Sequence, residues 1–268
     1  MPYHGGAVQP NATVHIVYWG RYWASGSDAA PLYLDNLFQH LGQTHCTRTV
    51  SQYCWHTGGV VFRAAEYQFS SDLLWGVSDD PSRITGYPSP TAAEIGAEAL
   101  AQNPNLTTPG HKYPVGYPTT VVVTPPGIVP VEEKKNGCGM HFLYAYKDPN
   151  TPRQTDWMNV IDLPWGVINT SFPSRCWGGG HGALSTIAGH EWAEAATDPG
   201  VSWVNTLGNG ATPGRAAWVN FSSNEHEIGD ICESAGQFKL TLGGNTYTMQ
   251  RLWSNNANSG HGGCVYGS

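Results

Sequence analysis

The first half of the chain alternates short runs of β-branched and aromatic residues with stretches in which apolar residues recur at helical spacing. The runs predict strands at residues 13–19, 59–69, 119–123 and 140–146. The periodic stretches predict helices at residues 30–41 and 91–100, and the second begins with the capping box Thr91-Ala92-Ala93-Glu94. This order predicts an α/β or α+β fold, in which a mixed β-sheet packs with helices.

The second half of the chain opens with a change of pattern. Residues 150–180 are rich in proline, glycine, tryptophan and polar residues, which predicts a surface loop. Residues 183–197 predict a helix, because alanine, leucine, isoleucine and glutamate dominate there and Asp198-Pro199-Gly200 ends it. The remaining pattern predicts a hairpin, with strands at 237–242 and 246–253 around the turn Gly243-Gly244-Asn245.

Composition narrows the classes of protein that fit this pattern. Of the 268 residues 40% are hydrophobic and only 12% charged, which excludes disorder for the bulk of the chain. The net charge of −7 disfavours a nucleic-acid or anionic-membrane binder, which needs a basic face. No apolar run approaches the roughly 20 residues of a membrane helix. Residues 1–268 are expected to form a single globular domain, and any subdivision would fall near residues 150–180.

The six cysteines contain no CxxC pair, which disfavours a zinc knuckle or a redox motif. They are Cys46, Cys54, Cys138, Cys176, Cys232 and Cys264. An even number fits a disulfide framework, and from number alone buried free thiols fit equally well. The start of the chain lacks a basic segment followed by an apolar one. Either the protein is not exported, or its targeting segment was removed.

The predicted helix at 183–197 contains the motif HExxE, in which His190 and Glu194 are one helical turn apart and project from the same face. Zinc accepts imidazole nitrogen and carboxylate oxygen, so both side chains can hold one ion. Glu191, next to the first ligand, would then be the general base that activates water. A carboxylate also suits calcium, and the alternative is a solvated helix face in which His190 satisfies a buried polar group.

A second acidic segment, residues 224–233, places several carboxylates around Cys232. Glu227 or Asp230 could supply the third protein ligand that a catalytic zinc site requires. Glu233 could orient His190 from outside the ligand set. The alternatives are a solvated acidic loop and a calcium site that is unrelated to the helix.

Other residues give weaker signals. A lone histidine in a glycine loop, such as His181, is usually exposed, and we do not assign it a role. Asp198 could be a ligand downstream of the helix, or a turn residue before Pro199. Ser185 and Cys176 have no convincing triad around them, which disfavours a nucleophilic hydrolase. The tryptophans and tyrosines could line a glycan or peptide groove, although buried core is commoner for scattered aromatics.

The chain resembles the Exordium-like (phosphate-induced protein) family in segments that follow one another along nearly its whole length. These segments are residues 3–6, 15–20, 138–142, 187–194, 227–233 and 253–264. The resemblance implies an extracellular protein with disulfides, and it implies no settled activity. The motif residues that it carries over are His190, Glu191, Glu194, Glu227, Asp230, Cys232 and Glu233. Residues 190–194 alone also resemble the zincin metallopeptidases, although Glu194 replaces the second histidine.

With this resemblance, all six cysteines are expected to be paired in a secreted protein. Short loops close readily, so we expect Cys46 with Cys54, Cys138 with Cys176, and Cys232 with Cys264.

The leading hypothesis is a secreted zinc-dependent hydrolase, specifically a metallopeptidase with a zincin-like active-site helix at 183–197. Zn²⁺ is the expected cofactor, with Ca²⁺ as an additional or alternative ion, and the substrate is a peptide or protein. The second hypothesis is an Exordium-like binding or signalling protein with a structural metal or none, whose aromatics contact a cell-wall polysaccharide. A nitrogen ligand separates the two, because calcium sites use oxygen almost exclusively.

Overall fold

A computed structural model of the chain describes residues 1–4, 6, 14–41, 65–70, 89–102, 119–131, 137–147, 155–169, 176–199, 203–204, 217–221 and 227–266. The helices are η1 (Arg21–Ser25), α1 (Ala30–Leu41), α3 (Ala92–Gln102), α5 (Trp165–Asn169), α6 (Gly180–Thr197), η4 (Asp230–Ala235) and α7 (Ala257–Gly260). The strands are β1 (Val14–Trp19), β2 (Ala65–Ser70), β3 (Thr119–Thr124), β4 (Met140–Lys147), β5 (Thr155–Pro164), β6 (Trp203–Val204), β7 (Gln237–Leu242), β8 (Asn245–Gln250), β9 (Leu252–Ser254) and β10 (Gly263–Val265).

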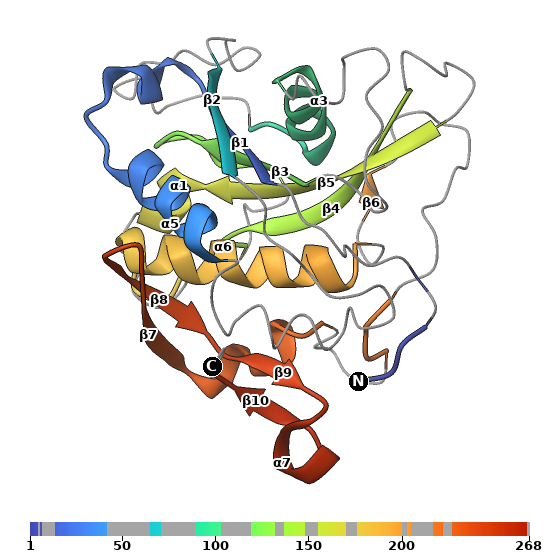
Figure 1. The fold of residues 1–268 in the computed structure, drawn as a ribbon. Helices are drawn as coiled ribbons and strands as arrows, with labels where there is room; N and C mark the ends of the chain where they lie inside the picture. Colours follow the sequence, from blue (N-terminus) through green and yellow to red (C-terminus); the bar gives the residue numbers. More distant parts are fainter. Residues whose placement is uncertain are drawn as a thin grey trace.

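A six-stranded sheet in the order β2-β1-β3-β5-β4-β6 forms the centre of the fold. Neighbouring strands from β2 to β5 run parallel, β4 is antiparallel to β5, and β6 pairs with β4 in parallel. Helices cover both faces of the sheet (Figure 1). The expected mixed sheet packed with helices is therefore confirmed. The first six residues of the strand predicted at 59–69 lie outside the described residues.

Successive residues of the central strands enter two different hydrophobic clusters. In β3, Val121 and Val123 pack in the cluster that contains residues of α1, α5 and α6. Val122, between them, packs in the cluster that contains residues of α3. All six residues of β3 are buried, as are all six of β1, which is typical of a sheet with both faces covered.

Strand β5 corrects the surface loop that the sequence predicts over residues 150–180. Residues 155–169 form a ten-residue strand between β3 and β4, followed by helix α5. The strand signal was obscured by Asn159 and Asp162, which interrupt the apolar run and are nevertheless fully buried. Asn159 is accommodated because its amide donates a 3.1 Å hydrogen bond to the carbonyl of Ala195 in α6.

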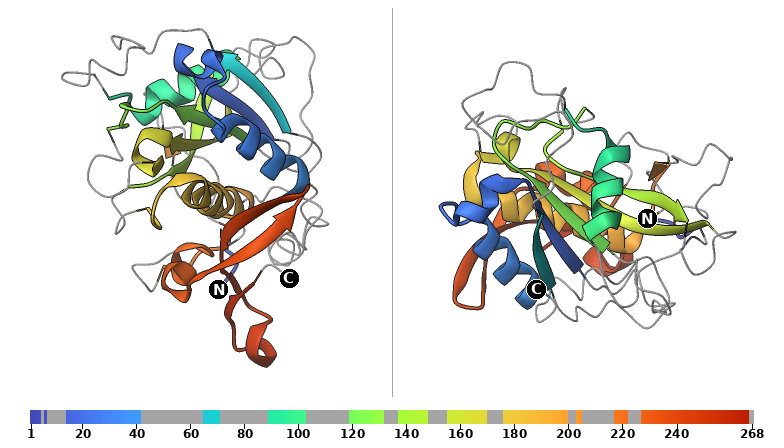
Figure 2. Two further views of the ribbon diagram at one scale, coloured as in Figure 1. Left: turned by 90° about the vertical axis from the view of Figure 1, so that its left-hand side faces the viewer. Right: turned by 90° about the horizontal axis from the view of Figure 1, so that it is seen from above.

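Helix α6 lies between the central sheet and a C-terminal β-layer, which we define as β7 to β10 (Figures 1 and 2). Every residue from 183 to 197 is buried, as expected for a helix that is covered on all sides. The helix predicted at 183–197 is confirmed and starts three residues earlier, at Gly180. None of the described helices is long and apolar enough to cross a membrane.

The C-terminal β-layer begins with the predicted hairpin, formed by β7 and β8. The second strand is shorter than the predicted 246–253, because β8 ends at Gln250 and residues 252–254 form β9, which pairs with β10. Gly243 and Gly244, between β7 and β8, have φ of 52° and 81°, as a tight hairpin turn requires. The hairpin is joined to α6 through the carbonyl of Thr248, which accepts hydrogen bonds from the hydroxyls of Ser185 (2.8 Å) and Thr186 (3.0 Å). The layer is therefore attached to the helix by specific polar contacts as well as by packing.

Two of the three predicted disulfides are confirmed. Cys138 is bonded to Cys176, and Cys232 is bonded to Cys264. The predicted pair of Cys46 and Cys54 lies outside the described residues. The capping box is also confirmed, since the Glu94 carboxylate accepts a 2.8 Å hydrogen bond from the amide of Thr91 at the start of α3.

The close approach of α3 to β4 makes Gly96 a sensitive position. A Cβ added there would lie 2.1 Å from Cδ2 of the Tyr144 ring, whereas one at Gly189 in α6 would lie 2.5 Å from the terminal methyl of Met249. A methionine methyl can rotate away, but a buried ring cannot. We predict that Gly96→Ala lowers the free energy of unfolding by a net amount of about 1–2 kcal/mol, because overpacking at this contact costs about 2–3 kcal/mol and the gain in helix propensity is only about 1 kcal/mol.

Urea denaturation of both variants measures this difference. Gly189→Ala is the matched control, and its free energy of unfolding should stay closer to that of the wild-type protein. A Gly96→Ala protein as stable as the wild type would contradict the close packing of α3 on β4.

Candidate metal centre

Helix α6 presents His190, Glu191 and Glu194 from a buried position, with 8%, 7% and 2% of each residue exposed. The i, i+4 spacing works as expected from the sequence, since Nε2 of His190 lies 3.0 Å from Oε2 of Glu194. Because α6 is covered by the sheet on one side and the C-terminal β-layer on the other, these polar groups lie inside the protein.

A second imidazole, His141 of β4, joins this group. Phe142 and Tyr144 face the α3 side of the sheet, so the alternation of a strand turns His141 toward α6. Its Nδ1 lies 3.2 Å from Oε2 of Glu191 and 3.7 Å from Oε2 of Glu194. Sequence reasoning missed this residue, because its neighbours within residues 140–146 are all apolar or aromatic and no alternation distinguishes the two faces of β4.

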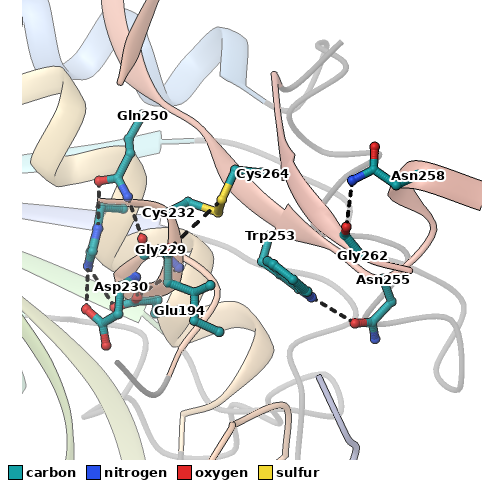
Figure 3. The surroundings of a disulfide bond; sticks show 12 residues. Glu194, Gly229, Asp230, Cys232, Gln250, Trp253, Asn255, Asn258, Gly262 and Cys264 are labelled. Atoms are coloured by element: carbon teal, nitrogen blue, oxygen red, sulfur yellow. Dashed lines mark hydrogen bonds and ion pairs between the residues drawn. A yellow bond between two sulfur atoms is a disulfide. The ribbon is translucent and has the colours of Figure 1, made fainter. Parts of the chain in front are cut away.

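Residues 227–230 close the other side of the cluster. Oε1 of Glu227 lies 3.4 Å from Nε2 of His141, and Oδ1 of Asp230 lies 3.5 Å from Nε2 of His190. Glu194 anchors this segment, because its Oε1 accepts hydrogen bonds of 3.1 Å from the backbone amides of both Gly229 and Asp230 (Figure 3). The structure thus brings together the residues predicted from the two sequence segments, apart from Glu233.

Gly229 fits at this point because it has no side chain. A Cβ there would lie 2.7 Å from both Oε1 of Glu194 and Nδ1 of His190. Its backbone has ordinary helical angles, so the requirement is for space and not for an unusual conformation.

Gln250 of β8 fixes the orientation of His190. The amide nitrogen of Gln250 donates to the carbonyl of Gly229 (Figure 3). This leaves Oε1 of Gln250 to face Nδ1 of His190 at 2.9 Å. Nδ1 must therefore carry a proton, and Nε2 is turned toward Glu194 and Asp230. Histidines that bind metals are typically held in this way. Gln250 thus occupies the supporting position that the sequence assigned to Glu233, which is exposed on η4.

Both described disulfides lie next to segments that supply the cluster. Cys138 precedes His141 by three residues. Its disulfide with Cys176 connects the start of β4 to the segment just before α6. Cys232 follows Asp230 by two residues and ties η4 to β10 (Figure 3). The chain segments that carry His141 and Asp230 are therefore fixed covalently as well as by packing.

The charges of the cluster shift its titration. Burial would lower the pKa of His141, but the carboxylates of Glu227 and Glu191 outweigh it and raise this pKa well above the ordinary value. The pKa of His190 is raised in the same way, against burial, mainly by Glu194. Burial raises the pKa of Glu227 to about 8, although His141 opposes the shift. Without a cation, the imidazoles are the positive charges that balance these carboxylates.

The donor set fits a divalent metal ion. His190, Glu191 and Glu194 offer ligand atoms within 4.8 Å of one another, and so do His141, Glu194 and Glu227. Two atoms bound to one tetrahedral zinc ion by bonds of about 2.0–2.2 Å lie about 3.3 Å apart. The separation of 3.0 Å between His190 Nε2 and Glu194 Oε2 is close to this value.

Two residues considered from the sequence do not belong to these groups of ligand atoms, although the charge of Asp198 contributes to the raised pKa of Glu227. Asp198 is fully buried, and its Oδ1 accepts a 2.7 Å hydrogen bond from the backbone amide of Ala217. His181 stacks on Tyr33 and Trp165, at ring-centroid distances of 4.9 and 5.5 Å. It is nine residues from His190, about 13 Å along the helix. Asp198 thus holds the backbone at Ala217, and His181 packs at the start of the helix.

No family model, no curated protein and no solved structure matches the chain.

The orientation of His190 by Gln250 gives a testable consequence. We predict that Gln250→Leu lowers the free energy of unfolding by about 1–3 kcal/mol, because it leaves the Nδ1–H of His190 buried without its acceptor. The carbonyl of Gly229 keeps the amide of Cys232 as a donor, at 2.9 Å. The exposed Gln237 also donates a side-chain hydrogen bond, to Thr186. Gln237→Leu is therefore the control, with an expected change within about 0.5 kcal/mol. Urea denaturation compares them, and equal effects would argue against a supporting role for Gln250.

Proposed function

We propose that the protein is a zinc-dependent hydrolase, specifically a metallopeptidase, with His190 and Glu194 as ligands and Glu191 as general base. Asp230, whose Oδ1 lies 3.5 Å from Nε2 of His190, is the third ligand of this proposal. The observation that carries it is the orientation of His190. Its Nδ1 is occupied by Gln250, and its Nε2 points at two carboxylates inside a buried site.

The nitrogen donor favours zinc over calcium. Calcium takes six to eight oxygen ligands, whereas catalytic zinc sites use three protein ligands that include imidazole. A bound zinc ion would supply Lewis acidity, which lowers the pKa of water and polarises a carbonyl group. Exposure also fits the proposal, because Asp230 is only partly buried, with 39% of its side chain accessible. The cluster is thus open to solvent on the side of Asp230.

Glu191 is placed for proton transfer. Its Oε2 accepts a hydrogen bond of 3.2 Å from Nδ1 of His141, which holds one side of the carboxylate in place. In the proposed reaction Glu191 takes a proton from the attacking water and delivers it to the leaving amine. His141 acts as a positioning residue in this step.

A cavity next to the cluster offers room for part of a substrate. It has a volume of about 450 Å³ and is lined by Trp177 and Phe238 together with residues at the start of α6. The ring centroid of Trp177, which lines the cavity, lies 6.2 Å from that of His190, so this side chain lies between the cavity and the cluster. The lining combines these two aromatic rings with the polar side chains of Gln237, Lys239 and Thr248, and such a mixed surface supports a peptide segment as the occupant.

The two described disulfides support an extracellular or otherwise oxidising location for this activity. We therefore extend the proposal to a secreted hydrolase. Its competitor, the Exordium-like binding protein with a structural metal, is one of the outcomes of the experiment below.

The proposal predicts a separation between metal binding and catalysis. Glu191→Gln should retain bound zinc and the fold but lose activity by about 10²–10⁴-fold, because the amide cannot accept a proton. His190→Ala should lose zinc together with activity, since this removes the ligand that Gln250 orients. Glu98→Gln, a buried glutamate of α3, is the matched control and should keep wild-type activity.

Cleavage of a peptide library, read by mass spectrometry with and without a chelator, measures these activities. Cleavage that persists undiminished in Glu191→Gln would reject the mechanism. A wild-type protein that binds zinc but cleaves no peptide would favour the Exordium-like binding protein.

A further inference from the structure

The cluster contains two imidazoles that are held in the same way. In His190, Nδ1 faces the oxygen of Gln250 and Nε2 faces carboxylates. In His141, Nδ1 lies 3.2 Å from the carboxylate of Glu191, and Nε2 faces Oε1 of Glu227 at 3.4 Å. Each ring thus has an oxygen acceptor at Nδ1, which leaves Nε2 available as a metal ligand.

The facing atoms of His141 and Glu227 lack hydrogen-bond partners within the described structure. His141 and Glu227 are each only 5% exposed, yet Nε2 of one and Oε1 of the other have no hydrogen bond of normal geometry. Buried polar atoms are almost always hydrogen-bonded, and two that meet only as an ion pair at 3.4 Å require an explanation. A cation between these two atoms would satisfy both at once.

Glu194 connects this pair to the first site. Glu194 is a member of both sets of potential metal ligands, the set with His190 and Glu191 and the set with His141 and Glu227. Its Oε2 lies 3.0 Å from Nε2 of His190. A carboxylate oxygen of Glu194, one of Glu227 and a ring nitrogen of His141 also lie within 4.8 Å of one another. Its Oε1 is held by backbone amides, so the position of this carboxylate is fixed. A fixed carboxylate between two imidazoles is suited to bridge two ions.

The formal charge of the cluster agrees with two ions. Four carboxylates face the two imidazoles, and they belong to Glu191, Glu194, Glu227 and Asp230. With both imidazoles neutral, as metal ligands must be, these groups carry a formal charge of about −4. Two divalent cations would neutralise this charge in a largely buried space.

We propose that the protein holds a second divalent transition-metal ion, bound by His141, Glu227 and the shared carboxylate of Glu194. This inference rests on the proposed function for the first ion, at His190, and extends it to a two-metal centre. Mixed nitrogen and oxygen donors suit zinc or a neighbouring first-row metal, and we use Zn²⁺ as the probe. In hydrolases a pair of ions stabilises both the attacking and the leaving oxygen.

The test is the zinc stoichiometry of the whole purified chain, measured by elemental analysis after dialysis and by calorimetric titration of the metal-free protein. The wild type should bind two equivalents. Glu227→Gln, which preserves size, and His141→Ala should each bind one and keep the ion at His190. His15→Ala is the matched control, because His15 is a histidine of the same sheet that is also 5% exposed, and it should bind two.

The outcomes separate this inference from the proposed function. The wild type could bind one equivalent of zinc that Glu227→Gln retains and His190→Ala loses. That result would overturn the second site and leave the first. Two equivalents in both Glu227→Gln and His141→Ala would also overturn it, since the second ion would then lie elsewhere. No bound zinc would overturn both proposals.

A second measurement does not depend on how the variants fold. The wild-type protein loaded with Co²⁺ should show magnetic coupling between the two ions in electron paramagnetic resonance, because the Glu194 carboxylate bridges them. A cobalt spectrum of isolated, uncoupled ions at saturation would overturn the bridged centre.

Discussion

The burial of several carboxylates beside two imidazoles is the constraint on which the rest of the structure depends. Glu191, Glu194 and Glu227 are each less than a tenth exposed, and an ionised carboxylate is costly to remove from water unless it is paired. Hydrogen bonds from two backbone amides offset part of this cost for Glu194, and ion pairs with the imidazoles offset more. Positive charge at this site, from protons or from metal ions, is therefore a requirement of the fold as well as of any chemistry.

This constraint explains the layered arrangement around α6. The sheet contributes His141 on one side of the helix, and the C-terminal β-layer contributes Gln250 on the other. A helix at the surface would leave its carboxylates in water, where ligand geometry is less restricted and charge interactions are weaker. The C-terminal β-layer is thus a supporting wall of the site, attached to the helix through Thr248 and tied to η4 by the disulfide of Cys232.

The sequence predicts those features that depend on local pattern. Helix α6, the capping box of α3 and the glycine turn of the hairpin all follow from spacing and turn chemistry, and the structure contains them. Strand β5 was missed because buried Asn159 breaks its apolar pattern, and its hydrogen bond to α6 exists only after the layers have packed. The same limit applies to Gln250, whose position depends on the crossing of β8 over the helix and on no local motif.

Glu194 and His190 each use one polar atom to stabilise the fold and direct the other into the cluster, which links stability to binding. Oε1 of Glu194 holds the backbone at residues 229 and 230, while Oε2 faces the imidazoles. Nδ1 of His190 is fixed by Gln250, while Nε2 faces the carboxylates. Because Oε1 of Glu194 and Nδ1 of His190 are held by hydrogen bonds within the fold, the positions of Oε2 and Nε2 are fixed before any ligand binds. Such preorganisation reduces the reorganisation cost of binding, and it requires that the fold tolerate concentrated negative charge in the meantime.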